Sequence, residues 1–138
     1  MSGAFGGWVL DHHAVAAWAR VQPYAQALVW SAMEVGMTVV VPAAVLALAY
    51  ADIAEQDHDV LRELLDLPVT VFDPLTAAET PELGRVLAAA VDPAALTPDA
   101  VALAHVVHAA SRRGWPVLTG DSAALRALNL QLDLDELP

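Results

Sequence analysis

Short apolar runs alternate along the chain with longer stretches in which apolar residues recur at helical spacing. Four of the short runs predict strands, at residues 8–10, 38–41, 69–72 and 116–118. The β-branched run in the second of these is typical of a strand buried on both faces. The tail, residues 130–137, alternates apolar and acidic residues and predicts an edge strand with one solvent-exposed face. The stretches between the runs predict helices.

The stretch 96–121 shows most clearly how a helix leads into a strand. We expect Thr97 to cap the helix, with Pro98 at its first position, because a hydroxyl and a proline are favoured there. Gly114 is placed to end the helix in a left-handed conformation. The apolar strand at 116–118 follows at once, and the next helix begins after it.

Five strands alternating with helices, and little chain left over for long loops, predict an α/β fold. The expected architecture is a three-layer α/β/α sandwich around a mainly parallel sheet of about five strands. The chain of 138 residues has no internal repeat or linker, so residues 1–138 are expected to form a single domain. Periodicity does not give the order of the strands.

Three of the predicted strands are followed by an acid: Asp11, Asp73 and Asp121, the last after a Thr-Gly pair. Open α/β sheets bind their ligands in the crevice outside the carboxyl ends of the strands. The sequence therefore predicts a site at this edge of the sheet.

The composition excludes several kinds of chemistry. With no cysteine, the chain has no disulfide, thiolate metal site or cysteine nucleophile. All six basic residues are arginine, which excludes a P-loop lysine and Schiff-base chemistry. A phosphoacceptor receiver domain is dismissed for the same reason, because that family draws a lysine from its last strand. The net charge of −11 opposes non-specific binding of nucleic acid, although a bound divalent ion could reverse the field locally.

No apolar run is long enough to predict a membrane span, since the longest, residues 37–51, is interrupted by Thr38 and Pro42. The first eight residues lack the pattern of a signal peptide. We therefore expect a soluble, cytoplasmic protein that does not associate with membranes.

Four segments resemble the PIN domain as it occurs in bacterial VapC-type toxins: GWVLDHHAVAAW, VPAAVLALAYAD, ELGRVLAAA and AHVVHAASRRGWPVLTGD. Their order and spacing match over nearly the whole chain. The resemblance implies a PIN-like α/β/α sandwich and metal-dependent endoribonuclease activity. It also implies three or four acids holding Mg²⁺ or Mn²⁺, commonly in a homodimer, with an antitoxin encoded alongside.

The acidic quartet that the resemblance implies is incomplete in this chain. The first acid falls on Asp11, and the acid of the Thr-x-Asp turn falls on Asp121, with Thr119 as its threonine. The second and third acids fall at about Leu48 and on Leu103. Two of the four charges are therefore replaced by leucine.

The remaining acids define the candidate site. Asp11 and Asp121 are the predicted metal ligands, because Mg²⁺ is held in many proteins by one or two carboxylates with waters and phosphates. Asp99 lies one helical turn before the third position and is the further candidate catalytic residue. Asp52 lies one turn after the second position but toward the far end of its helix, which makes it the weaker substitute.

Each candidate also has a plainer interpretation. Asp11 and Asp121 could simply cap the helices that follow them, and Asp99 could be an acid that complements a helix dipole. His105 stands where many members of the family have a histidine. It lies three residues before His108, a spacing that suits zinc, but no third nitrogen or sulfur ligand is evident in the sequence. A partly exposed histidine face is therefore expected.

Two functions follow from these residues. The first is a PIN-like protein with a degenerate metal site, non-catalytic or weakly active, that acts by binding a protein partner or by dimerising. In this case Mg²⁺ or Mn²⁺ binds weakly or not at all. The alternative is an Mg²⁺- or Mn²⁺-dependent endoribonuclease, the toxin of a toxin–antitoxin pair, which would bind RNA through its metal.

Overall fold

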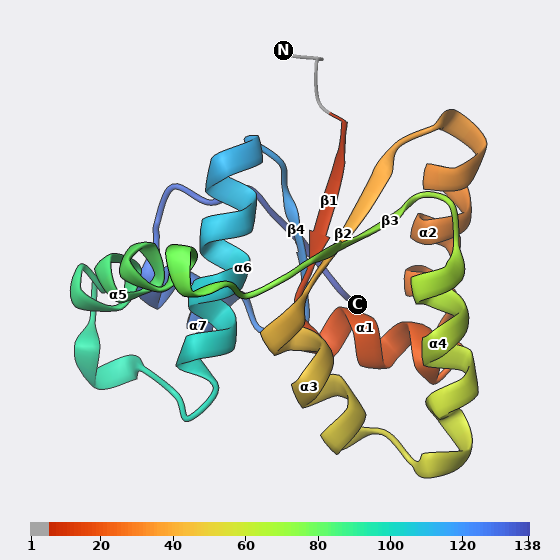
Figure 1. Cartoon of the computed structure of the whole chain (residues 1–138), viewed down its shortest axis with the longest axis horizontal. Coiled ribbons are helices and arrows are strands. Elements are labelled where there is room, and N and C mark those ends of the chain that lie inside the picture. Colours follow the sequence, from red (N-terminus) through yellow and green to blue (C-terminus); the bar gives the residue numbers. More distant parts are fainter. Residues whose placement is uncertain (1–5) are drawn as a thin grey trace.

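The computed structural model, which describes residues 6–138, contains a parallel five-stranded sheet with the strand order β3-β2-β1-β4-β5 (Figure 1). This confirms the predicted α/β fold. The strands are β1 (Gly7–Leu10), β2 (Thr38–Pro42), β3 (Thr70–Asp73), β4 (Val117–Thr119) and β5 (Leu134–Glu136).

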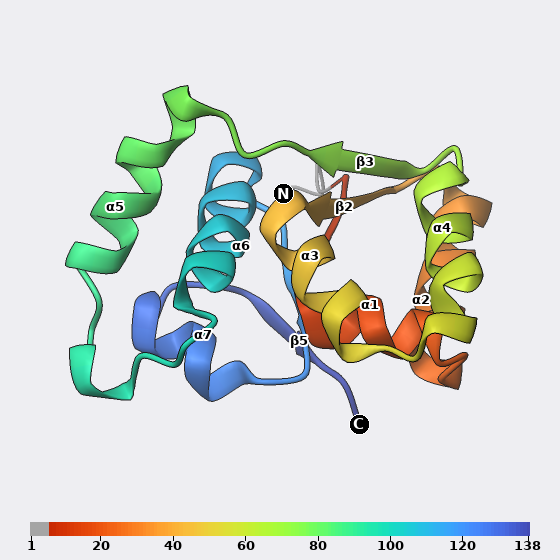
Figure 2. The same ribbon diagram turned by 60° about the horizontal axis from the view of Figure 1, so that its bottom comes forward.

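Helices cover both faces of the sheet. They are α1 (His12–Ala19), α2 (Pro23–Val35), α3 (Ala43–Asp52), α4 (His58–Asp66), α5 (Thr80–Ala88), α6 (Ala100–Arg113) and α7 (Ser122–Leu128), with short 3-10 turns η1 (Glu55–Asp57), η2 (Ala77–Glu79) and η3 (Pro93–Ala95). Helices α1, α2 and α4 lie on one side, and α5, α6 and α7 on the other (Figure 2). Helix α3 follows β2 and packs against both α1 and α6, so it joins the two helical layers.

The strand order places a topological switch point between β1 and β4. From β1 the chain moves outward through β2 to β3, then returns past β1 to form β4 and β5. Connections leave the two central strands in opposite directions, which opens a crevice at their carboxyl ends. Asp11 follows β1 and Asp121 follows β4, so both acids belong to this switch point. Asp73 ends β3, the edge strand two positions from β1.

The middle of the sheet forms the core of the protein. Val39, Val40 and Val41 of β2 are fully buried, as the β-branched run predicted. Neighbouring strands contribute Val9 and Leu118, which are also inaccessible to solvent. The functional residues at the strand ends are therefore held by a rigid apolar scaffold.

The predicted start of the late helix is wrong by two residues. Helix α6 begins at Ala100, with Asp99 at the N-cap position but making no side-chain capping bond. The Thr97 hydroxyl instead hydrogen-bonds the Asp99 carboxylate, which keeps both side chains from capping the helix. The predicted end is confirmed, because Gly114 has a left-handed conformation with φ of 70°.

The tail forms a shorter strand than predicted. Strand β5, Leu134–Glu136, runs parallel to β4 and makes the second edge of the sheet. On either side of it the Val117 N–H donates to the Asp133 carbonyl and the Leu137 N–H donates to the Thr119 carbonyl. Within residues 6–138, none of the helices has the length and apolar character needed to cross a bilayer.

Gly7 allows β1 and β2 to pair closely. A methyl group at this position would overlap the carbonyl oxygen of Thr38, which is rigid backbone of the neighbouring strand. We expect Gly7→Ala to lower the free energy of unfolding by about 2–3 kcal/mol, measured by chemical denaturation. Gly84 in α5 is the matched control: its added methyl would meet nothing within 4 Å, and Gly84→Ala should stabilise the protein slightly. Equal stability of the two variants would contradict this account of the strand contact.

Candidate functional site

Asp11 is a buried carboxylate that joins β1 to β4. Its side chain is 0% exposed, and both oxygens accept hydrogen bonds from within the chain. Oδ1 accepts from the backbone N–H of Ala14 at 2.9 Å, which caps α1. Oδ2 accepts from the Thr119 hydroxyl at 2.6 Å and from the Gly120 N–H at 3.2 Å. Asp11 therefore caps α1, which is its plainer interpretation, and it also joins β1 to the end of β4.

Asp121 lies on the other side of the same threonine. Its backbone N–H donates to Thr119 Oγ1 at 2.8 Å, while its carboxylate accepts from the Ala124 N–H at 3.2 Å and caps α7. The Thr119 hydroxyl thus donates to Asp11 and accepts from Asp121. The structure brings the segments of these two sequence-predicted residues together at the switch point, and their role as metal ligands stays a prediction.

A pocket of about 300 Å³ lies beside the first turn of α1. It is lined by His12, His13, Leu48, Ala51, Asp52 and Asp99. His12 Nε2 lies 3.3 Å from the Asp99 carboxylate, and Asp52 pairs with Arg20 at 3.1 Å. Both candidate substitute acids therefore border one pocket, including Asp52, which the sequence favoured less. Among the described residues, neither Asp11 nor Asp121 lines it.

Leu48 and Leu103, where the resemblance implies the second and third acids, have different surroundings. Leu48 is half-buried and faces the pocket from α3. Leu103 is 2% exposed and belongs to the hydrophobic core beneath α6. A carboxylate at position 103 would therefore need a partner inside the protein.

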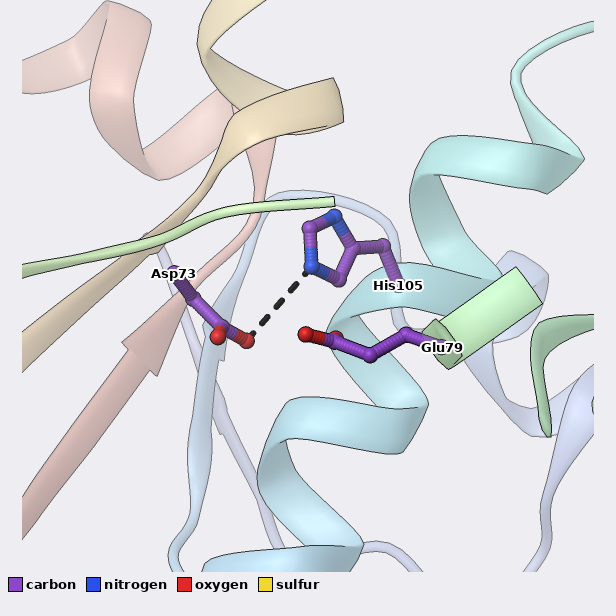
Figure 3. A group of neighbouring side chains, drawn as sticks. All are labelled: Asp73, Glu79 and His105. Carbon is purple, nitrogen blue, oxygen red and sulfur yellow. Dashed lines mark ion pairs between the residues drawn. The ribbon is translucent and has the colours of Figure 1, made fainter. Parts of the chain in front are cut away.

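A second group of polar side chains gathers at the edge strand (Figure 3). Asp73 ends β3, Glu79 lies in η2 and His105 projects from α6; we call these three residues the acid–histidine cluster. Each offers a ligand atom, and these atoms lie within 4.8 Å of one another. In the described part of the chain this is the group of three that comes close enough to share a metal ion, and it contains none of the predicted site residues.

Basic side chains surround the acid–histidine cluster. Arg112 donates to Asp73 Oδ1 at 3.0 Å, and Arg113 lies 3.7 Å from Oδ2 of the same carboxylate. His105 Nε2 lies 3.5 Å from Asp73 Oδ2, and His108 Nε2 lies 3.9 Å from Glu79 Oε2. The expectation of a partly exposed histidine face is wrong for His105, which is 0% exposed.

Sequence reasoning missed the cluster, although two signals were present. Asp73 was visible as an acid at a strand end. His105 shares one face of α6 with Ala102 and Ala109, which are three residues before and four residues after it, and both alanines are buried. Small residues on both sides of a histidine allow it to approach the sheet. Nothing in the sequence pattern pointed to Glu79, because the turn η2 places it there.

Burial sets the protonation of the histidines. Desolvation lowers the pKa of His105 below its ordinary value, against the opposing effect of the Asp73 and Glu79 carboxylates. Desolvation and the neighbouring His13 lower the pKa of His12, against the opposing effect of Asp11 and Asp99. In both cases burial favours the neutral imidazole, the form that keeps a lone pair for a ligand.

The comparisons with known proteins concern the fold. No family model matches the sequence, and no curated protein matches it. A solved structure does: a chain in the crystal structure of VapBC2 from Rickettsia felis bound to a DNA fragment from their promoter. The two chains superpose with a TM-score of 0.67 at 15% identity, over 95% of this chain and 98% of that one. The chain has a PIN-like fold. The likeness extends over almost the whole sandwich, but at this identity it concerns architecture alone.

Removing the Thr119 hydroxyl should weaken the junction between β1 and β4. In Thr119→Val the Asp11 Oδ2 atom loses its 2.6 Å donor inside the protein, and we expect unfolding to require about 1–3 kcal/mol less free energy. Thr119→Ser is the control, because it keeps the hydroxyl and should retain most of the stability. Chemical denaturation of the two variants measures the difference. A larger loss in Thr119→Ser, which lacks the methyl group, than in Thr119→Val would show that packing of that methyl group, and not the hydrogen bond, holds the junction.

Proposed function

We propose that this PIN-like chain has a degenerate metal site, is non-catalytic or weakly active as a nuclease, and acts through a protein partner. The observation that supports this is the set of hydrogen bonds that Asp11 already accepts inside the chain. Both of its oxygens are bonded to donors of the same chain, and the side chain has no exposed surface. A metal ion would have to share these oxygens with three existing donors.

The leucines at positions 48 and 103 also support a degenerate metal site. Leu103 lies in the core and Leu48 half-buried at the pocket, so neither position adds charge to the switch point. Asp11 and Asp121, with Asp99 as the third catalytic candidate, would have to recruit Mg²⁺ or Mn²⁺ with a reduced ligand set. An ion held by so few carboxylates keeps most of its water and binds weakly. It activates a nucleophile correspondingly less.

The proposal of a protein partner rests on the similar structure. That structure is of VapBC2 bound to promoter DNA, which makes an antitoxin the kind of partner we propose for this chain. We further propose that residues 1–138 act as a single PIN-like domain. The net charge of −11 disfavours direct contact of this chain with RNA or DNA.

The alternative is an Mg²⁺- or Mn²⁺-dependent endoribonuclease of the VapC type. One observation favours it: the Thr119 hydroxyl joins the segments of Asp11 and Asp121 at the switch point, beside a pocket bordered by Asp52 and Asp99. A substrate phosphate and waters could complete the coordination of an ion there. Measurements of metal affinity and of RNA cleavage distinguish the two proposed functions.

Calorimetric titration with Mg²⁺ and Mn²⁺ tests the state of the switch point. We expect dissociation constants in the millimolar range or weaker, because at most one or two carboxylates are available. Asp121→Asn should weaken this binding further, and purified protein should cleave RNA weakly or not at all. Micromolar affinity that vanishes in Asp11→Asn, or strong RNA cleavage that disappears in Asp121→Asn, would establish the endoribonuclease instead.

The second partner that we propose is another copy of this chain. The two copies would form a homodimer in which α2 makes the contact surface. This helix exposes three large apolar side chains, Tyr24, Trp30 and Val35, and Trp30 is 48% exposed. Light scattering during gel filtration should give about twice the chain mass of 14.5 kDa, and Trp30→Arg should shift the protein toward the monomer. Val91→Arg is the control, because Val91 is an exposed apolar residue outside α2. A monomeric wild-type protein would refute the dimer.

A further inference from the structure

The acid–histidine cluster is separate from the switch point and has no part in the proposed function. It lies at the end of the edge strand β3, two strands away from β1. Four of its buried polar atoms have no hydrogen-bond partner: Asp73 Oδ2, Glu79 Oε2 and both ring nitrogens of His105. An unsatisfied buried polar group costs about 1–3 kcal/mol, so native proteins leave few of them. Several such atoms facing one another require a physical reason.

We propose that Asp73, Glu79 and His105 form a binding site for a divalent transition-metal ion of the zinc class. Their ligand atoms lie within 4.8 Å of one another, and one ion between them would satisfy an atom of each. The side chains come from three different elements and point toward a common centre (Figure 3). These ligand atoms are buried and lack a hydrogen bond, although ion-pair contacts of 3.5–3.9 Å reach Asp73 Oδ2 and Glu79 Oε2.

The ligand types select the metal. One imidazole nitrogen and two carboxylates suit Zn²⁺, which binds histidine and acidic oxygens and leaves a fourth position for water in open sites. Mg²⁺ and Ca²⁺ prefer oxygen ligands alone. The metal binds a free nitrogen of the imidazole ring, and both ring nitrogens of the fully buried His105 lack a hydrogen-bond partner.

Arg112 and Arg113 would compete with a metal ion for the carboxylate of Asp73. Arg112 holds Asp73 Oδ1 at 3.0 Å and leaves Oδ2 without a hydrogen bond. This contact fixes the orientation of the carboxylate, as a partner behind a metal ligand does. Arg113 approaches Oδ2 only to 3.7 Å, and it also donates to the Ala109 carbonyl at 3.1 Å. An ion bound to Asp73 Oδ2 and Glu79 Oε2 would therefore compete with two long contacts, Arg113 at 3.7 Å and His108 at 3.9 Å.

The bound ion would join the loop after β3 to helix α6. Asp73 and Glu79 enclose this loop, and His105 lies on the helix beneath it. Because the three ligands meet only in the folded chain, binding stabilises the fold in proportion to the logarithm of free metal over the dissociation constant. The expected effect of the bound ion is therefore to increase the stability of the folded chain.

Cobalt and zinc titrations of untagged, chelator-treated protein test the site. We expect one Co²⁺ per chain with visible d–d absorption, displaced by Zn²⁺, whereas Mg²⁺ in excess does not displace it. Glu79→Gln should weaken Zn²⁺ at least tenfold and abolish its effect on the midpoint of thermal unfolding. Glu82→Gln is the matched control: Glu82 pairs with Arg85 on the neighbouring helix α5, and its loss should change the affinity less than twofold.

Three results would overturn the proposal: no binding of Zn²⁺ or Co²⁺ by the wild-type chain, equal affinity in Glu79→Gln, or binding that is lost in Asp121→Asn. The last would place the ion at the switch point. A measurement on the wild type alone removes any dependence on the folding of variants. Zn²⁺ should shift the ring resonances of His105 and leave those of His58, which packs edge-on against Tyr50, unchanged.

Discussion

A buried carboxylate that is bonded to three donors of the same chain joins the two central strands of this sheet. Removing an ionised group from water carries a penalty on the order of several kcal/mol, which a protein must offset with fixed donors. For Asp11 these donors are the Thr119 hydroxyl and the amides of Ala14 and Gly120. They come from the first turn of α1 and from the turn after β4. The charge is therefore stabilised only when both central strands and the helix that follows β1 are in place.

The second buried acid of the sheet is stabilised by a different means. Asp73 has Arg112 bonded to one oxygen and Arg113 at a greater distance from the other, so its charge is balanced by cations and not by amide dipoles. This difference decides which acid suits a ligand role. Asp11 uses both oxygens for internal bonds, whereas Asp73 keeps an oxygen without a hydrogen bond beside the buried ring of His105. Two acids at similar positions, each at the end of a strand, thus differ in whether an oxygen is available to bind a ligand.

The sequence was sufficient for the elements of the fold and for part of the site. Short apolar runs located the strands, and the acids after them marked Asp11, Asp73 and Asp121. Strand order was inaccessible, because it depends on pairing between distant segments, and this order alone separates Asp73 from the other two acids. Glu79 could not be found, since an irregular turn carries it to the cluster. His105 was assigned to a partly exposed face, because only the packing of α6 reveals that it faces inward.

Leu48 and Leu103 stand where the sequence resemblance to PIN domains implies two further acids. Two carboxylates about 4 Å apart repel by roughly 4 kcal/mol at an effective dielectric near 20, so a full acid cluster requires a cation or a proton. Burying a leucine contributes about 1.5–3 kcal/mol instead, and Leu103 is 2% exposed. With this leucine in the core and the Asp11 oxygens already bonded, the crevice holds its shape through internal contacts. The Asp11 oxygens therefore complete a structural junction between β1 and β4, whereas the ligand atoms of Asp73, Glu79 and His105 beside β3 lack a hydrogen bond.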